Sequence, residues 1–264
     1  MSSVSEIEKA RRNKVGRGTL TRQRLILAAE QEFALHGRSG ATALNITKRA
    51  EARNINAVAY HFKNMEGLFE ATMRYRMEPA NEYREKLLDR MEQDGPLQVI
   101  DLAAAFLIPH IWTLRHIGQR SYCAQFFASL QSQDIHGFMR YAHRPWCSGV
   151  LRVLASATTL MDQFYSSDES IMRLDTAISQ FVYGTAQREG RLRDQAVLDH
   201  KELDLQWFVY CCASIDYSAQ GMIGSKNDSS LDRMGIIFDH AAAVEQELGQ
   251  PDWFDTALVS GLLG

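Results

Sequence analysis

Hydrophobic residues in the first part of the chain recur at helical spacing and define short segments separated by turns. Between residues 21 and 36 the apolar positions repeat every three or four residues, and Gly37 follows where a glycine commonly ends a helix. Thr42 is a favourable N-cap for a second segment, and Asn54 is one for a third. The pattern therefore predicts three helices, over residues 21–37, 42–50 and 54–62.

Longer helices are predicted beyond this region. The next segment runs over residues 65–91 and is kinked or interrupted at Pro79. Pro96 suits the first turn of the following helix, and Ser166 with Glu169 forms a capping-box signature. No proline occurs between residues 146 and 250, and hairpin dipeptides between alternating apolar runs are absent, so the chain is expected to be all-α. The expected later helices cover residues 97–117, 121–133, 146–165, 166–189, 201–220 and 229–249.

The change from short to long helices divides the chain into three parts. Residues 1–18 form a basic arm without an apolar face, expected to be flexible and disordered without a partner. Residues 19–78 form a first domain, and residues 79–264 form a larger helical-bundle domain. The role of the tail after Pro251 is not indicated by any pattern.

Charge divides at nearly the same place. Residues 1–76 carry 14 Lys and Arg against seven Asp and Glu, a net charge of +7, whereas residues 77–264 carry a net charge of −10. A basic front on an acidic body suits a chain whose N-terminal part binds a polyanion. A chance fluctuation of charge along a helical protein is the alternative explanation.

Composition and motifs exclude several other classes. The chain of 264 residues is 45% hydrophobic and 23% charged, which rules out a disordered or collagen-like protein. Its longest uncharged apolar run, residues 102–109, is far shorter than the ~20 residues that span a bilayer, and the polar start lacks the apolar stretch of a signal peptide. The protein is expected to be cytoplasmic, with no membrane partner.

The sequence contains no motif that indicates catalysis or metal binding. The chain contains no Gly-x-Ser-x-Gly, P-loop, His-Glu-x-x-His or Gly-x-Gly-x-x-Gly motif, so we expect no enzyme activity and no cofactor. The four cysteines show no Cys-x-x-Cys spacing and are expected to be small buried hydrophobes. No metal ligands are expected.

The second and third short segments have the arrangement of a helix-turn-helix. A recognition helix must enter the ~12 Å major groove, with polar groups near its N-terminal end for base edges and phosphates. Asn54 and Asn56 supply such groups and Ala57 permits close approach, while Val58 and Phe62 face inward at an i, i+4 spacing. A two-helix unit of this spacing is common, so the pattern alone is a weak signal.

Residues 21–69 also resemble the DNA-binding domain of the TetR (tetracycline repressor) family of bacterial transcriptional regulators. The first helix carries the family's Arg, Ala-Ala, Phe and Gly pattern, and Ala41-Thr42 with Ile46 opens the second helix. Tyr60-His61-Phe62 closes the third, and Glu66-Gly67-Leu68-Phe69 begins the fourth. These elements are common individually, but their order and spacing together are specific.

The resemblance implies an all-helical homodimer whose N-terminal domains bind the half-sites of a near-palindromic operator in double-stranded DNA. The larger domain would hold a small-molecule effector and the dimer interface. The long apolar faces of the helices within residues 168–189 and 201–220 favour these helices for that interface. The protein is therefore expected to be a repressor that its effector releases from DNA. The residues expected to contact DNA are Thr42, Arg53, Asn54, Ile55, Asn56, Ala57, Tyr60, His61 and Lys63.

The sequence departs from the family pattern at three points. Glu51 stands where the turn usually has glycine, and the turn through Arg53 is one residue longer than usual. Met65 occupies the place where a lysine commonly contacts phosphate, so Lys63 would substitute for it. The chain is also longer than most of the family.

Aromatic and methionine side chains crowd the larger domain, where most are expected in the packed core. As a set they favour an apolar or aromatic effector bound between helices. The residues considered for the cavity are Phe106, Trp112, Phe126, Phe127, Trp146, Met161, Phe164 and Phe181, with Tyr183 as a further aromatic. Two other hypotheses remain: a helical interaction protein that binds an acidic partner, and an architectural DNA-binding protein without an effector.

Overall fold

The computed structural model describes residues 4–117, 121–133, 140–194, 201–220 and 228–249, and in these ranges the fold is all-α, as expected. Side chains are further restricted: those of residues 4–17, 112–117, 133, 201–203, 217–220 and 228–232 are not described. The chain divides into two compact units, which we name unit 1 (Met1–Arg76) and unit 2 (Met77–Gly264). The division lies two residues from position 78, where the sequence analysis ended the first domain.

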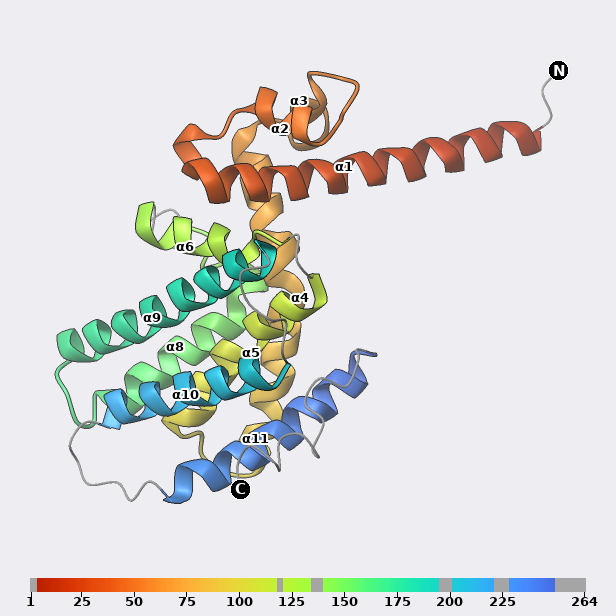
Figure 1. Cartoon of the computed structure of the whole chain (residues 1–264). Coiled ribbons are helices and arrows are strands. Elements are labelled where there is room, and N and C mark those ends of the chain that lie inside the picture. Colours follow the sequence, from red (N-terminus) through yellow and green to blue (C-terminus); the bar gives the residue numbers. More distant parts are fainter. Residues whose placement is uncertain (1–3, 118–120, 134–139, 195–200, 221–227, 250–264) are drawn as a thin grey trace. The chain divides into compact units, whose positions relative to one another are not determined.

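Unit 1 contains helices α1 (Val4–Gly40), α2 (Ala43–Arg49), α3 (Ala57–Phe62) and the beginning of α4 (Met65–Gln93) (Figure 1). Helix α1 begins at Val4, so the backbone of residues 4–18 is helical where the sequence analysis expected disorder. That expectation rested on the missing apolar face. Residues 4–18 contain no proline and include Glu, Lys, Ala and Arg, which allow a helix formed further along the chain to continue towards the N-terminus.

The ends of the short helices follow their capping residues. Gly37 has a non-helical backbone (φ 68°, ψ 174°) inside α1, which is where the sequence predicted that the first helix ends. The Thr42 hydroxyl accepts a hydrogen bond from the Asn45 N–H at 3.2 Å and caps α2, as predicted. Asn54 does not cap α3 as predicted. Its side chain accepts the Asn56 N–H at 2.9 Å and forms a local turn, and α3 begins after this turn, at Ala57.

The core of unit 1 joins the four helices through apolar side chains. Phe33 of α1 and Phe69 of α4 meet edge to face, with ring centroids 5.2 Å apart. A buried ion pair lies beside them, in which Arg76 Nη2 donates to Glu30 Oε1 at 3.0 Å. The other buried side chains of this core are Leu25, Ile26, Ala29, Ile46, Val58, Phe62, Leu68 and Met73.

Unit 2 is a helical bundle built on the second part of α4. Helix α5 (Val99–Ile117) is central, because it contacts α6, α8, α9, α10 and α11 (Figure 1). Its sequence is apolar on nearly all sides, as expected of a helix surrounded by others. The surrounding helices are α6 (Cys123–Gln133), η2 (Pro145–Cys147), α8 (Ser148–Met161), α9 (Ser167–Arg193), α10 (Lys201–Gln220) and α11 (Asp228–Glu247).

Several polar contacts set the bounds and positions of these helices. Ser166 caps α9 by accepting the Glu169 N–H, which confirms the predicted N-cap, while the Glu169 carboxylate accepts from Arg173, and α9 continues to Arg193. The buried Glu189 carboxylate accepts the N–H groups of Ala124 and Gln125, at 3.2 and 2.9 Å, and so caps α6. Negative charge is favourable at this helix end, which explains a buried carboxylate there.

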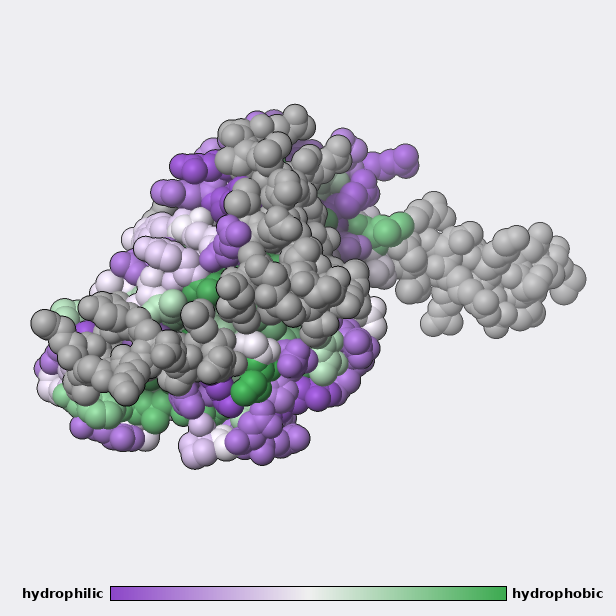
Figure 2. Space-filling model, turned by 60° about the horizontal axis from the view of Figure 1, so that its bottom comes forward, coloured by the Kyte–Doolittle hydropathy of each residue, from purple (hydrophilic) through white to green (hydrophobic). Residues whose placement is uncertain are grey.

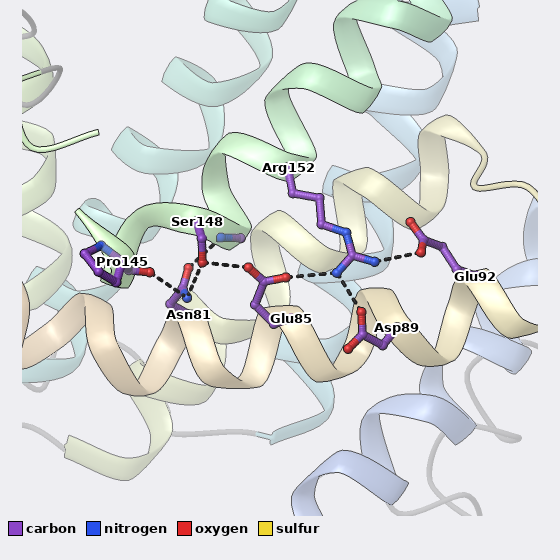
Figure 3. Close-up of polar contacts among 8 residues, drawn as sticks. Asn81, Glu85, Asp89, Glu92, Pro145, Ser148 and Arg152 are labelled. Carbon is purple, nitrogen blue, oxygen red and sulfur yellow. Dashed lines mark hydrogen bonds and ion pairs between the residues drawn. The ribbon is translucent and has the colours of Figure 1, made fainter. Parts of the chain in front are cut away.

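Helix α8 is held against α4 by a row of polar side chains (Figure 3). Arg152 of α8 donates to Glu85, Asp89 and Glu92 of α4, at 2.9, 2.7 and 2.7 Å. Residues three or four apart on a helix share a face. The carboxylates of Glu85, Asp89 and Glu92 therefore all reach the same guanidinium. We call this group the α4–α8 clamp.

None of the described helices combines the length and the hydropathy that crossing a membrane requires. On the face of the molecule shown in Figure 2, hydrophobic residues lie among hydrophilic ones.

Candidate functional site

The turn between α2 and α3 has the backbone geometry that glycine usually provides. Glu51 follows the C-cap of α2 with φ at 51°, and its N–H donates to the Lys48 carbonyl at 3.0 Å. The Ala52 N–H then donates to the Thr47 carbonyl at 3.1 Å, which closes the end of α2. A left-handed backbone costs a residue other than glycine roughly 1–2 kcal/mol. Glu51 thus occupies a position where glycine would be free of this cost.

Helix α3 and the turn before it have an inner and an outer face. Val58 and Phe62 are buried, as predicted, whereas Tyr60 is 79% exposed and Ile55 is 64% exposed. Ala57 is only 3% exposed, so it belongs to the inner face and not to the surface expected to approach DNA, because α3 begins later than predicted. The remaining exposed residues among those expected at DNA are Thr42, Arg53, Asn54, Asn56 and Lys63.

Basic side chains of unit 1 differ in whether they are paired. Arg49 and Arg76 are paired with the buried carboxylates of Glu32 and Glu30 and hold unit 1 together. Lys48, Arg53 and Lys63 are exposed, and no carboxylate among the described residues pairs with them. Exposed cations beside exposed amide side chains suit a surface that binds phosphate and base edges.

His61 lies between the two faces. Partial burial, and then the positive charge of Arg22, lower the pKa of His61 below its usual value of 6.5. Arg22 itself lies over the Phe62 ring, 5.0 Å from its centroid. At neutral pH His61 is therefore an uncharged side chain that donates or accepts hydrogen bonds.

A glycine fixes how α3 meets α4. The Asn64 side chain accepts the Gly67 N–H at 2.8 Å and caps α4. A Cβ atom at position 67 would lie 2.1 Å from the Phe62 carbonyl oxygen, which is closer than any real contact. Position 67 therefore requires glycine, because the end of α3 lies directly against the backbone there.

The second candidate site is a cavity of about 150 Å³ in unit 2, bounded by helices α4, α5, α6, α8 and α9. Its wall is mostly apolar, which is typical of small-molecule sites. The lining residues are Met77, Phe106, His110, Phe127, Leu130, Gln131, Val150, Leu154, Asp175, Ile178 and Val182.

Three residues contribute polar side chains to this wall: His110, Gln131 and Asp175. Burial, together with the positive charge of Arg84, lowers the pKa of His110 to about 3, so the imidazole is uncharged at neutral pH. Gln131 donates from Nε2 to the Ser179 hydroxyl at 2.7 Å, while its Oε1 is buried without a hydrogen-bond partner in the part of the chain that the structure describes. Asp175 adds a carboxylate.

A smaller cavity of about 50 Å³ adjoins the first, and Phe106, Leu154 and Ile178 line both. These three side chains therefore separate the two spaces. Met161 and Arg173 are also part of the smaller cavity's wall.

The structure distributes the residues considered for effector binding among four environments. Phe106, Phe127 and Met161 line the two cavities. Phe126 and Phe181 are buried in the core, and Trp146 is buried against Tyr141, so none of these three lines either cavity. Phe164 is 62% exposed, because it lies in the turn after α8, and Tyr183 is 41% exposed. Trp112 lies on α5, but its side chain is outside the described part of the chain.

Sequence reasoning missed the polar residues of the larger cavity, His110, Gln131 and Asp175. His110 follows Pro109 in an apolar helix, and Gln131 is one of three glutamines in α6. Neither belongs to a motif. The only available signal was a lone polar residue on an otherwise apolar helix face.

Comparison of the chain with models of known protein families and with curated protein sequences finds no match.

Proposed function

We propose that the protein is a ligand-responsive, DNA-binding transcriptional regulator of the TetR type, acting as a repressor. The observation that carries the proposal is the two-faced α3, which follows α2 across a tight turn. Its Val58 and Phe62 are buried, while Tyr60 and the preceding Asn56 are exposed next to Lys63. This arrangement supports α3 as the helix that enters the major groove.

The regulator acts as a homodimer in this proposal, with each unit 1 on one half-site of a near-palindromic operator. Helices α9 and α10 form the dimer interface, because they carry large apolar side chains on the surface. Ile171 and Met172 of α9 are 60% and 61% exposed, and Tyr210 of α10 is 71% exposed. A stable interface of this kind buries at least about 1,200 Å² of total surface.

A small molecule bound in the larger cavity releases the protein from DNA. The effector acts only through its different affinities for the DNA-binding and released conformations. Helix α4 supplies Met77 to the cavity wall and continues into unit 1, so the same helix belongs to both candidate sites. The α4–α8 clamp makes α4 and α8 move together, which couples the wall of the cavity to α4.

The proposal is tested by enrichment of duplexes from a random-sequence library with the full-length protein. The expected result is one near-palindromic motif whose half-site centres are separated by about one helical turn, ~34–36 Å. Asn56→Ala should lose the enrichment, whereas Gln246→Ala, an exposed amide on α11, should retain it. Retention of DNA without any enriched motif would favour an architectural protein, and no retention would favour an interaction protein with an acidic partner.

A further inference from the structure

We infer that the larger cavity of unit 2 binds a small aromatic molecule with an uncharged hydrogen-bond donor, such as a phenol or an aromatic amine, and disfavours aromatic carboxylates. The inference rests on the proposed function, because it names the chemical class of the effector. Three properties of the cavity carry it: its size, the unmatched acceptor of Gln131 and its lack of an unpaired cation among the described residues.

The size of the cavity suits one aromatic ring. A dry apolar cavity of about 150 Å³ in another protein holds a benzene molecule, and the larger cavity here has the same volume, about 150 Å³. Rings already form part of the wall: the His110 ring centroid lies 5.5 Å from that of Phe106 and 6.0 Å from that of Phe127. The adjoining cavity of about 50 Å³ leaves room for a short substituent if Leu154 or Ile178 changes rotamer.

The polar groups of the wall are mainly acceptors. Gln131 uses its amide N–H on Ser179, which leaves Oε1 buried and without a partner among the described residues. Asp175 adds a carboxylate, whose oxygens accept hydrogen bonds, although its side chain is exposed to solvent. A buried acceptor that finds no donor is unfavourable, so a ligand that brings an O–H or N–H is favoured over one that does not.

Charge in the wall opposes an anionic ligand. The uncharged His110 would not attract a carboxylate, and the exposed carboxylate of Asp175, although screened by solvent, adds a weak repulsion. Two cations of the described residues lie near the cavity. Arg173 lines the adjoining smaller cavity and is paired with Glu169 at 2.9 Å, and Arg84 lies behind the wall, 5.9 Å from the Phe106 ring centroid. Its guanidinium is directed at the carbonyl oxygens of Ala105 and Phe106, and Arg84 does not line either cavity.

Isothermal titration calorimetry on the full-length protein without DNA tests the inference with three probes of one ring size. These are 4-ethylphenol, ethylbenzene and 4-ethylbenzoate. We expect 4-ethylphenol to bind roughly fivefold more tightly than ethylbenzene, the value of one ordinary hydrogen bond, and 4-ethylbenzoate to bind at least about tenfold more weakly than 4-ethylphenol. Equal or tighter binding of 4-ethylbenzoate would overturn the inference.

Variants show whether the acceptor of Gln131 is responsible. Gln131→Leu should reduce the affinity for 4-ethylphenol to that for ethylbenzene and leave ethylbenzene unchanged. Gln246→Leu makes the same chemical change on an exposed residue of α11 outside the cavity and should alter neither. If Gln131→Leu does not fold, as judged by circular dichroism, Ile178→Trp provides an independent test. Ile178 lines both cavities, so the larger tryptophan side chain should fill the binding space and abolish binding of all three probes.

The outcomes separate this inference from the proposed function. Failure of all three probes to bind a protein that still selects a DNA motif would overturn the inference alone. Binding of 4-ethylphenol by a protein that selects no DNA motif would support the cavity's ligand class and contradict the regulator. An unchanged affinity of Gln131→Leu for 4-ethylphenol would also overturn the inference.

Discussion

Arg84 donates from Nε to the carbonyl oxygen of Ala105 at 3.0 Å, and this contact explains why a fully buried arginine lies in the core of unit 2. Proline has no N–H, so Pro109 cannot donate to Ala105, the residue four positions before it in α5. The guanidinium of α4 supplies the missing donor. Burial lowers the pKa of Arg84 to about 10, which still leaves it charged at neutral pH.

A double-mutant cycle tests this compensation. Arg84→Met should lower the free energy of unfolding by about 1–3 kcal/mol, because it leaves the Ala105 carbonyl without a donor. In a Pro109→Ala background the loss should be smaller, since residue 109 then has an N–H for that carbonyl. Urea denaturation followed by circular dichroism measures all four proteins. Equal losses in both backgrounds would show that Arg84 does not compensate for the proline.

Gly67 should not tolerate even a methyl group. In Gly67→Ala the new Cβ would meet the Phe62 carbonyl oxygen at 2.1 Å, so the junction of α3 and α4 must shift. We expect a loss of about 1–3 kcal/mol in stability and weaker DNA binding. Gly18→Ala is the matched control, because a Cβ atom there meets nothing within 4 Å. A thermal melt in which both variants match the wild type would contradict this account of position 67.

His110 predicts a dependence of stability on pH. Its pKa lies at about 3 in the folded protein against 6.5 for the ordinary group, so below pH 6.5 the unfolded chain binds more protons than the folded one. The contribution of His110 is therefore fully present above pH 6.5 and declines as the pH falls towards 3, by at most about 1.4 kcal/mol per pH unit. Urea denaturation at pH 7 and pH 5 should show a smaller decrease for His110→Phe than for the wild type. The same decrease in both proteins would assign the acid sensitivity to other groups.

The exposed apolar residues of α9 and α10 predict the state of assembly. The wild-type protein should sediment as a dimer at micromolar concentration in analytical ultracentrifugation. Tyr210→Glu should shift it towards monomer, because a charge would have to be buried in the interface. Phe164→Glu changes an equally exposed aromatic residue outside α9 and α10 and should remain dimeric. A monomeric wild type would remove the interface from the proposal.

Local signals in the sequence were sufficient for much of the fold. The caps at Thr42 and Ser166 and the end of the first helix at Gly37 were predicted correctly, because each depends on residues within one helical turn. The start of α1 was not, since absence of an apolar face does not prevent a helix from extending beyond its packed part. Ala57 was assigned to the wrong face of α3 because the first turn starts two residues later than the pattern suggested.

The cavity depended on relationships that a sequence does not display. Phe106 and Phe127 were predicted to line the cavity because they are aromatic. The same reasoning chose Trp146 and Phe164, but Trp146 is buried outside the cavity and Phe164 is exposed. In the sequence, nothing distinguishes Arg84 from an exposed arginine on a helix surface. Its role depends on the packing of α5, whose Ala105 carbonyl accepts its hydrogen bond. These roles arise from contacts between helices far apart in the chain, so helical periodicity carries no information about them.

Sequence preference for DNA is the central claim, and fluorescence anisotropy measures it most directly. A labelled duplex with the enriched motif and a scrambled duplex of equal length are titrated with the protein between 50 and 200 mM salt. The account predicts at least about 10³-fold tighter binding to the motif, a dimer per duplex and affinity that falls steeply with salt. Tyr60→Ala should weaken binding to the motif without changing stability, because its side chain is 79% exposed. Equal affinity for the two duplexes would contradict the account.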